Sequence, residues 1–492
     1  MMESKELSDE CSTQNHLPAG GAVEDKRTRR RRLFLQGFKI FTVSLAMWFM
    51  GSVFVFPSVV AEDLSRHNTT LYGNTLALTP TQMDMMGSVV SLGSLLGAWI
   101  FASLMMRLGR RLAMIIAGII AFLGWLGVAL LPNFAGIIVG RALTGVAIGG
   151  FSVTVIAYGI EMADMEVRGI MSMIINLGVP CGQVVTASVG YDARYYVVAF
   201  INILLPLFFI LGLAWMPESP SFLVIKGREA EARDILRSLR SKHADVEAEI
   251  QNYREMNIMS GEGTWKGLLQ PEILKSILIT SILFIFAYFT GYLVINANAS
   301  RIFADADSSI DNRLCTIIIL LVQVAGGACS VLLIDKLGRR KTLILSFCLM
   351  CVSLTGMAIY EGLVQNDEGG DGGTVTDSVL EGLDQEDPGP SRPNGWIPLV
   401  CLMVSQAGVA AGVNPIPFTL SHEYFPTWIR SQAASIPFSV STVASFGSLQ
   451  LYTPMRKGFT QAGLYGFYAA VSALGVLFTS FFIRETMGKK VG

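Results

Sequence analysis

Long apolar segments are the feature that most constrains the fold of this chain. A helix that crosses the hydrocarbon core of a bilayer needs about 20 mostly apolar residues. Only 15% of the chain is charged, against roughly 25% in soluble domains, so lipid is expected to cover much of its surface. The sequence predicts an all-α membrane protein with twelve transmembrane helices, at residues 38–60, 83–105, 112–131, 134–159, 170–190, 196–216, 274–297, 314–334, 342–362, 396–420, 432–454 and 462–483.

The distribution of basic residues predicts the orientation of these segments. Lys and Arg gather before the first segment, in KRTRRRR at 26–32, and again after the second and eighth segments. Because loops rich in Lys and Arg remain in the cytosol, both termini are expected to be cytosolic. A glycosylation sequon, Asn68-Thr69-Thr70, falls in the first loop on the opposite side, so Asn68 is a predicted glycosylation site.

The segments group into two bundles separated by a polar connection. Mixed charges surround apolar positions at helical spacing in that connection, which predicts short amphipathic helices. A Gly-rich, acidic stretch interrupts the second bundle and has the composition of a flexible linker. The predicted organisation is a cytosolic tail at 1–37, a six-helix bundle at 38–216, a cytosolic linker at 217–273, a second bundle at 274–483 with an outside loop at 363–394, and a short cytosolic tail at 484–492.

A repeated Gly-Arg-Arg motif shows that the two bundles are copies of one unit. MRLGRRLAM (106–114) and DKLGRRKTL (335–343) each follow the second segment of a bundle. Two further landmarks recur, namely a Glu seven residues before an Arg (Glu161 and Arg168, Glu423 and Arg430) and a Glu after the sixth segment (Glu218, Glu485). The fold class is therefore predicted to be two pseudo-symmetric six-helix halves, a recurrent transporter architecture.

The repeated charges stand at predicted cytosolic helix ends. Opposite charges on separate helices can pair when the cytosolic side closes and separate when it opens, so rocking of the halves would switch between two discrete packings. The alternative is that the arginines only follow the positive-inside rule. The recurrence of the Glu-to-Arg spacing favours the first interpretation for the set.

With these motifs the chain resembles the sugar porter family of the major facilitator superfamily over nearly its whole length, and within it the arthropod branch similar to facilitated trehalose transporters. Further matching motifs are GRALTG at 140–145, PESPSFL at 217–223, NPIP at 414–417 and the closing ETMG. The resemblance implies alternating access, sugar bound midway through the bilayer between the halves, and a plasma-membrane location. It also implies a cytosolic gate network of Arg110, Arg111, Glu161, Arg168, Glu218, Arg339, Arg340, Glu423, Arg430 and Glu485.

Several positions that the resemblance assigns to sugar contact depart from the family's pattern. The seventh-helix Gln-Gln and Asn positions are Ala287, Tyr288 and Leu293, and the tenth-helix Trp is Phe418. Unpaired hydroxyls in a dry site are costly, so a polar site of different shape is expected. The candidate substrate-binding residues are Asn176, Tyr288, Asn296, Asn298, Gln323, Asn414, Phe418, Ser441 and Thr442. Each could instead make an ordinary interhelical contact.

Charges inside the predicted spans bear on the energetics. Proton coupling requires a titratable acid within the membrane, and the first segment contains none, which favours facilitated diffusion over symport. Arg141 is the unusual intramembrane charge. It is expected either to extend to the interface or to pair with a carbonyl group or Asp84, at the pocket rim or in a structural role.

The predicted function is a facilitative (uniport) transporter of a sugar or sugar-like small solute. Two alternatives remain open, a carrier for a non-hexose solute and a non-transporting sensor on the same fold. The short tail after the last segment argues against a sensor. The sequence has no nucleophile–base constellation, phosphate loop or metal-ligand spacing, so no enzymatic activity, cofactor, metal or nucleic-acid partner is expected. The solute and the oligomeric state stay undetermined at this level.

Overall fold

The computed structural model describes residues 26–163, 168–240, 245–262, 265–305, 311–368, 395–425 and 429–485, and these residues are almost entirely helical. The first half contains α1 (Lys26–His67), α2 (Pro80–Leu108), α3 (Arg110–Leu130), α4 (Phe134–Met162), α5 (Arg168–Val189) and α6 (Tyr195–Ala214). Short helices α7 (Pro220–Ile225), α8 (Glu229–Leu239) and α9 (Val246–Glu262) follow. The second half contains α10 (Pro271–Phe289), α11 (Tyr292–Asp305), α12 (Asn312–Leu337), α13 (Arg339–Glu368), α14 (Ile397–Gly408), α15 (Pro415–Glu423), α16 (Arg430–Gln450) and α17 (Tyr452–Phe482).

Ten helical segments of the described chain are long and apolar enough to cross a bilayer, which confirms a multi-pass all-α fold. The other two predicted spans are helical but fall short of that criterion. The apolar part of α5 covers only 174–189, and α16 carries six serines that lower its hydropathy. Two predicted spans are broken helices. The span at 274–297 turns at Gly291 between α10 and α11, and the span at 396–420 contains a π-helical turn at Val409–Val413.

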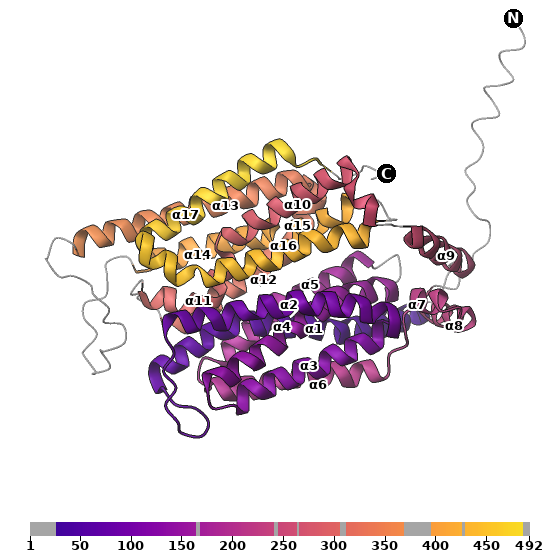
Figure 1. The fold of residues 1–492 in the computed structure, drawn as a ribbon, viewed down its shortest axis with the longest axis horizontal. Helices are drawn as coiled ribbons and strands as arrows, with labels where there is room; N and C mark the ends of the chain where they lie inside the picture. Colours follow the sequence, from indigo (N-terminus) through magenta and orange to yellow (C-terminus); the bar gives the residue numbers. More distant parts are fainter. Residues whose placement is uncertain are drawn as a thin grey trace, which may run out of the picture.

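The two halves lie side by side as separate bundles, and each has its own apolar core (Figure 1). We call α1–α6 the N-half and α10–α17 the C-half. Helices α7–α9 lie at one end of the molecule, and the loop at 68–79 lies at the other (Figure 1). The first end, which carries both Gly-Arg-Arg motifs, is the arginine end, and the second is the loop end.

Glycines allow the N-half helices to approach at backbone distance. A Cβ atom added to Gly97 of α2 would lie 2.1 Å from the carbonyl oxygen of Val146, and one added to Gly149 of α4 would lie 2.1 Å from that of Ser94. Each of these glycines has another glycine four residues before it, at Gly93 and Gly145. Such spacing of small residues is how membrane helices pack without a hydrophobic driving force, and it makes α2 and α4 one rigid unit.

Most contacts between the halves come from three helix pairs, namely α1 with α11, α2 with α16, and α5 with α12, and α17 also contacts α2. The serines of α16 lower its hydropathy. The membrane fold accommodates them because some of them face α2 rather than lipid. Ser445 and Ser91 hydroxyls lie 2.8 Å apart, and Ser88 of α2 donates to the side-chain oxygen of Gln450 at 2.8 Å. A polar helix is therefore placed at the junction between the halves.

Candidate functional site

The glycines of the two Gly-Arg-Arg motifs adopt the same unusual backbone conformation. Gly109 has φ 97° and ψ 169°, and Gly338 has φ 82° and ψ 167°, a region that essentially only glycine enters. A Cβ atom on either residue would lie 2.5 Å from a carboxylate oxygen, that of Glu218 or Glu485 respectively. Glycine is thus required here both by the backbone and by the close approach of an acidic side chain.

The two carboxylates cap helices. Glu218 accepts hydrogen bonds from the backbone N–H groups of Arg110 at 2.9 Å and Arg111 at 3.1 Å, at the start of α3. Glu485 does the same at the start of α13, where Arg339 and Arg340 donate at 3.0 and 3.1 Å. The first N–H groups of a helix lack intrahelical partners, and negative charge is favourable there. Each acid therefore joins the segment that follows the last long helix of its half to the start of α3 or α13.

The second arginine of each Gly-Arg-Arg motif caps the C-terminal end of another helix in the same half. The Arg111 guanidinium donates to the carbonyl oxygens of Leu213 at 3.0 Å and Ala214 at 2.7 Å, at the end of α6. Arg340 donates to the carbonyl of Ser480 near the end of α17. A cation at a helix C-terminus satisfies free carbonyls and opposes the negative end of the helix dipole.

The first arginine of each motif forms an ion pair. Arg110 lies 3.5 Å from Glu161 at the end of α4, and Arg339 lies 3.1 Å from Glu423 at the end of α15. Glu161 also accepts from the hydroxyl of Ser221 at 2.6 Å. The described contacts thus join three helices within each half, α3, α4 and α6 in one, and α13, α15 and α17 in the other.

The side chains of Arg168 and Arg430 lie outside the described residues, so their part in the network stays a prediction. The same holds for the predicted making and breaking of pairs between the halves. What the structure adds is that eight of the ten expected gate residues occupy two equivalent networks, one in each half.

Arg240, which the sequence analysis did not single out, contacts the network of the N-half from the linker helices. Arg240, which follows α8, is only 3% exposed and donates to the backbone carbonyls of Glu161 at 3.1 Å and Ala163 at 2.8 Å. Its other partner is the carboxylate of Glu249, at 2.7 Å. Burial and the Glu249 charge raise the pKa of Tyr253, which keeps that hydroxyl protonated as a donor to Glu249. The linker helices are thereby tied to the end of α4.

Polar contacts at the loop end join the two halves. Ser300 of α11 donates its hydroxyl to the backbone carbonyl of Ser58 in α1 at 2.7 Å, and its own N–H donates to the Ser58 hydroxyl at 3.1 Å. Arg313 at the start of α12 lies 3.7 Å from Glu62 near the end of α1. The N-half and C-half are therefore held together at this end.

Arg141 is buried inside the N-half, with 1% of its surface exposed. Its guanidinium donates to the backbone carbonyls of Val53 at 2.9 Å and Met86 at 3.1 Å, and lies over the ring of Phe56. The structure therefore supports pairing with carbonyl groups, and the predicted extension of the side chain to the interface is wrong because the guanidinium is buried between helices. The role it indicates is structural, since it joins α4 to α1 and α2.

The expected solute-contacting residues of the C-half differ in how far their polar groups are already satisfied. Asn296 and Gln323 are buried, and the side-chain oxygen of each has no hydrogen-bond partner in the described part of the chain. An unpaired buried acceptor is costly, so these two amides are the most available to a ligand. In contrast, the hydroxyls of Ser441 and Thr442 donate to carbonyls of their own helix.

The remaining candidates lie around the broken helices. Asn298 interrupts α11 with φ −121° and ψ 19°, and Asn414 precedes α15 directly after the π-helical turn. The ring of Tyr288 lies 5.6 Å from that of Tyr292, and Phe418 packs edge-on against Phe284 at 4.9 Å. Asn176 lies on an exposed face of α5 in the other half.

Comparison with known proteins decides what kind of protein this is. A family model described as "Sugar (and other) transporter" matches residues 30–491. The chain belongs to the sugar (and other) transporter family. The chain is 28% identical to the facilitated trehalose transporter Tret1 of Apis mellifera ligustica. The match covers 98% of this chain and 93% of the Apis protein. The protein of the same name from Polypedilum vanderplanki is 26% identical over 93% and 87% of the two chains.

Solved structures of the E. coli xylose transporter XylE share the fold. Its partially occluded inward-open form superimposes on this sugar-transporter family member with a TM-score of 0.74, at 19% identity, covering 92% of this chain and 99% of that one. Its inward-open form gives a TM-score of 0.72. The predicted family and fold class are confirmed, and so is the prediction that the protein is a transporter rather than an enzyme.

The structure also reveals a buried amide that sequence analysis missed in this transporter. Gln406 of α14 is fully buried, and neither its oxygen nor its nitrogen has a partner among the described residues. It stands three residues before the π-helical turn, and such turns are frequent at functional sites. A Gln within an otherwise apolar run was the available signal in the sequence.

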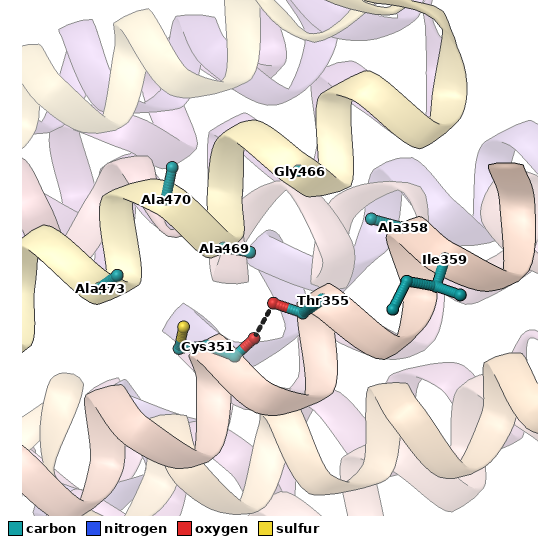
Figure 2. A pocket seen from close by; sticks show the side chains of 8 residues that line it. All are labelled: Cys351, Thr355, Ala358, Ile359, Gly466, Ala469, Ala470 and Ala473. Atoms are coloured by element: carbon teal, nitrogen blue, oxygen red, sulfur yellow. Dashed lines mark hydrogen bonds between the residues drawn. The ribbon is translucent and has the colours of Figure 1, made fainter.

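A groove of about 440 Å³ between α13 and α17 is a different feature from the solute site (Figure 2). Small side chains line it, and the one hydrogen bond drawn there runs from Thr355 to the carbonyl of Cys351 (Figure 2). Both helices belong to the C-half, and none of the expected solute-contacting residues lines the groove. It therefore lies away from the junction where a solute would pass.

Proposed function

We propose that this protein is a facilitative transporter of a sugar or sugar-like solute that works by alternating access. The observation that carries the proposal is the placement of its polar contacts. At the arginine end each half is joined internally by its own network, whereas at the loop end the halves are joined to each other. Rocking of the halves requires two rigid bodies whose contacts can open at one end of the molecule while contacts at the other end close.

The arginine end is assigned to the cytosol and the loop end to the outside, with both termini cytosolic and the protein in the plasma membrane. The positive-inside rule supports this assignment. Asn68 is exposed at the loop end, which supports its role as a glycosylation site. The gate residues would then control access from the cytosol.

Trehalose is the first solute to test, because similar proteins carry the name facilitated trehalose transporter. The unpartnered amides of Asn296, Gln323 and Gln406 support a solute that offers hydroxyl groups. A second candidate is a less hydroxylated solute. The aromatic pairs at Tyr288 and Phe418 favour this second candidate, because the family's pattern has Gln and Trp at these two positions.

Transport assays in cells that express the protein test this proposal. Uptake of labelled trehalose, glucose and a panel of less hydroxylated solutes should reveal saturable entry that stops when concentrations are equal. Accumulation against a gradient, abolished by an uncoupler, would contradict facilitation. Absence of entry for every solute by a protein present at the surface would favour the sensor alternative.

Variants at the ion pairs connect transport to the network. Glu161→Gln and Glu423→Gln should abolish cycling and leave surface expression largely intact, because each removes the charge that holds a motif arginine. Glu231→Gln is the matched control, since Glu231 forms an exposed pair with Arg228 at the same end. Loss of surface protein in the first two variants would assign those glutamates to folding instead.

A further inference from the structure

A carboxylate is buried at the junction of the two halves near the loop end. The side chain of Asp84, in α2 of the N-half, has no exposed surface. One of its oxygens accepts from the backbone N–H of Thr453 at 2.9 Å, at the start of α17 in the C-half. The other lies 3.4 Å from the guanidinium of Arg301 in α11. Both partners of this N-half acid therefore come from the opposite half.

Arg301 connects this carboxylate to a candidate solute residue. The same guanidinium nitrogen that faces Asp84 donates to the side-chain oxygen of Asn298 at 3.0 Å. Asn298 is the residue at which α11 departs from helical geometry, and its amide nitrogen donates to the carbonyl of Val294. The Arg301 guanidinium also lies over the ring of Tyr452, at 5.5 Å, which holds it between α11 and α17.

We propose that Asp84 and Arg301 are positioning residues for transport that couple Asn298 to closure of the loop end. In the closed arrangement Arg301 holds Asn298 and Asp84 together. When the halves separate at the loop end, Asp84 loses both of its partners and Arg301 no longer fixes the position of Asn298. The inference rests on the proposed alternating access, and it adds a residue pair outside the gate network.

The two members of the pair should respond differently to substitution. Removing Arg301 leaves a buried carboxylate without its counter-charge, which is strongly unfavourable, so the closed loop end should open. Removing the charge of Asp84 leaves Arg301 partly exposed and still bonded to Asn298, and an Asn at position 84 can still accept from Thr453. Arg301→Gln should therefore act more strongly than Asp84→Asn, and adding Asp84→Asn to Arg301→Gln should partly reverse its effect.

Labelling from the loop side tests this without any solute. Ala187 of α5 lines a small cavity between the halves beside Ser58 and Ser300, so Ala187→Cys in a background without native cysteines reports opening to a membrane-impermeant maleimide. Arg194→Gln is the matched control, because Arg194 pairs with the buried Asp63 at the same end of the molecule, and both residues belong to the N-half.

The expected result is at least a fivefold faster labelling in Arg301→Gln, in line with the usual range of coupling between sites. Arg301→Lys should restore slow labelling, and Arg194→Gln should leave the labelling rate unchanged. The external KM in Arg301→Gln should fall more than the maximal rate changes, since a larger fraction of molecules can bind from outside. Unchanged labelling in Arg301→Gln, or equal acceleration by Arg194→Gln, would overturn the inference. Because labelling needs no solute, a shift without sugar transport would leave the coupling standing and refute the proposed function alone.

Discussion

Replacing Gly109 by Ala should destabilise the N-half through two separate effects. The backbone conformation at this position costs a non-glycine residue about 1–3 kcal/mol. The new Cβ would also meet the Glu218 carboxylate at 2.5 Å, which must move away from the N–H groups of Arg110 and Arg111. A hydrogen bond to a charged group contributes about 1.5–3 kcal/mol, so losing even one brings the total to about 3 kcal/mol or more.

Two other glycines separate the effects. Gly227 also has a positive φ, 75°, but a Cβ there would have nothing within 4 Å, so Gly227→Ala should cost only about 1–2 kcal/mol of backbone strain. Gly338→Ala should behave like Gly109→Ala, because Glu485 stands where Glu218 stands.

Thermal unfolding of purified protein in detergent measures the difference. For domains of 150–250 residues, 1 kcal/mol corresponds to roughly 2–4 °C in Tm. Gly109→Ala should therefore lower Tm by about 6–12 °C, and Gly227→Ala by roughly a third to two thirds of that. Equal losses in the two variants would refute the argument that the carboxylate cap stabilises the start of α3.

Three further predictions follow from the same contacts. Arg141→Met removes two guanidinium hydrogen bonds to buried carbonyls, each worth about 1.5–3 kcal/mol. The amount of monodisperse protein in size-exclusion chromatography should therefore drop sharply, and a wild-type profile would contradict a structural role. Arg240→Gln frees the last carbonyls of α4, and it should speed hydrogen exchange at 158–163 and lower the transport rate several-fold, with Glu231→Gln as the unaffected control. Asn68→Gln should abolish a glycosidase-sensitive shift in gel mobility, and a shift that persists in this variant would mean that the glycan is attached to another residue.

The membrane architecture could be predicted from the sequence because it depends on simple properties of each segment. Length and hydropathy locate most spans, and the repeated Gly-Arg-Arg marks the two halves. The predicted span at 432–454 is helical but falls short of the hydropathy criterion for a physical reason. The serines of α16 serve contacts with α2, and hydropathy alone cannot distinguish a helix that faces another half from one that faces water.

The roles within the gate network could not be derived in the same way. The sequence groups Arg110, Arg111 and Glu218 as charges, but only the structure shows that Glu218 caps α3 and that Arg111 caps α6. These roles depend on which backbone groups are left free at helix ends, and that depends on how the helices meet. Arg240 and Gln406 were missed because their importance comes from burial, which a single sequence does not reveal.

Cross-linking the halves at the loop end is the most direct test of the central claim, that two rigid halves must part there for transport. Ser58 and Ser300 already contact one another across α1 and α11, so Ser58→Cys with Ser300→Cys places two thiols at that junction. Oxidised protein should show no uptake, reductant should restore it, and each single variant should transport under both conditions. Uptake at the normal rate by fully cross-linked protein would contradict the account.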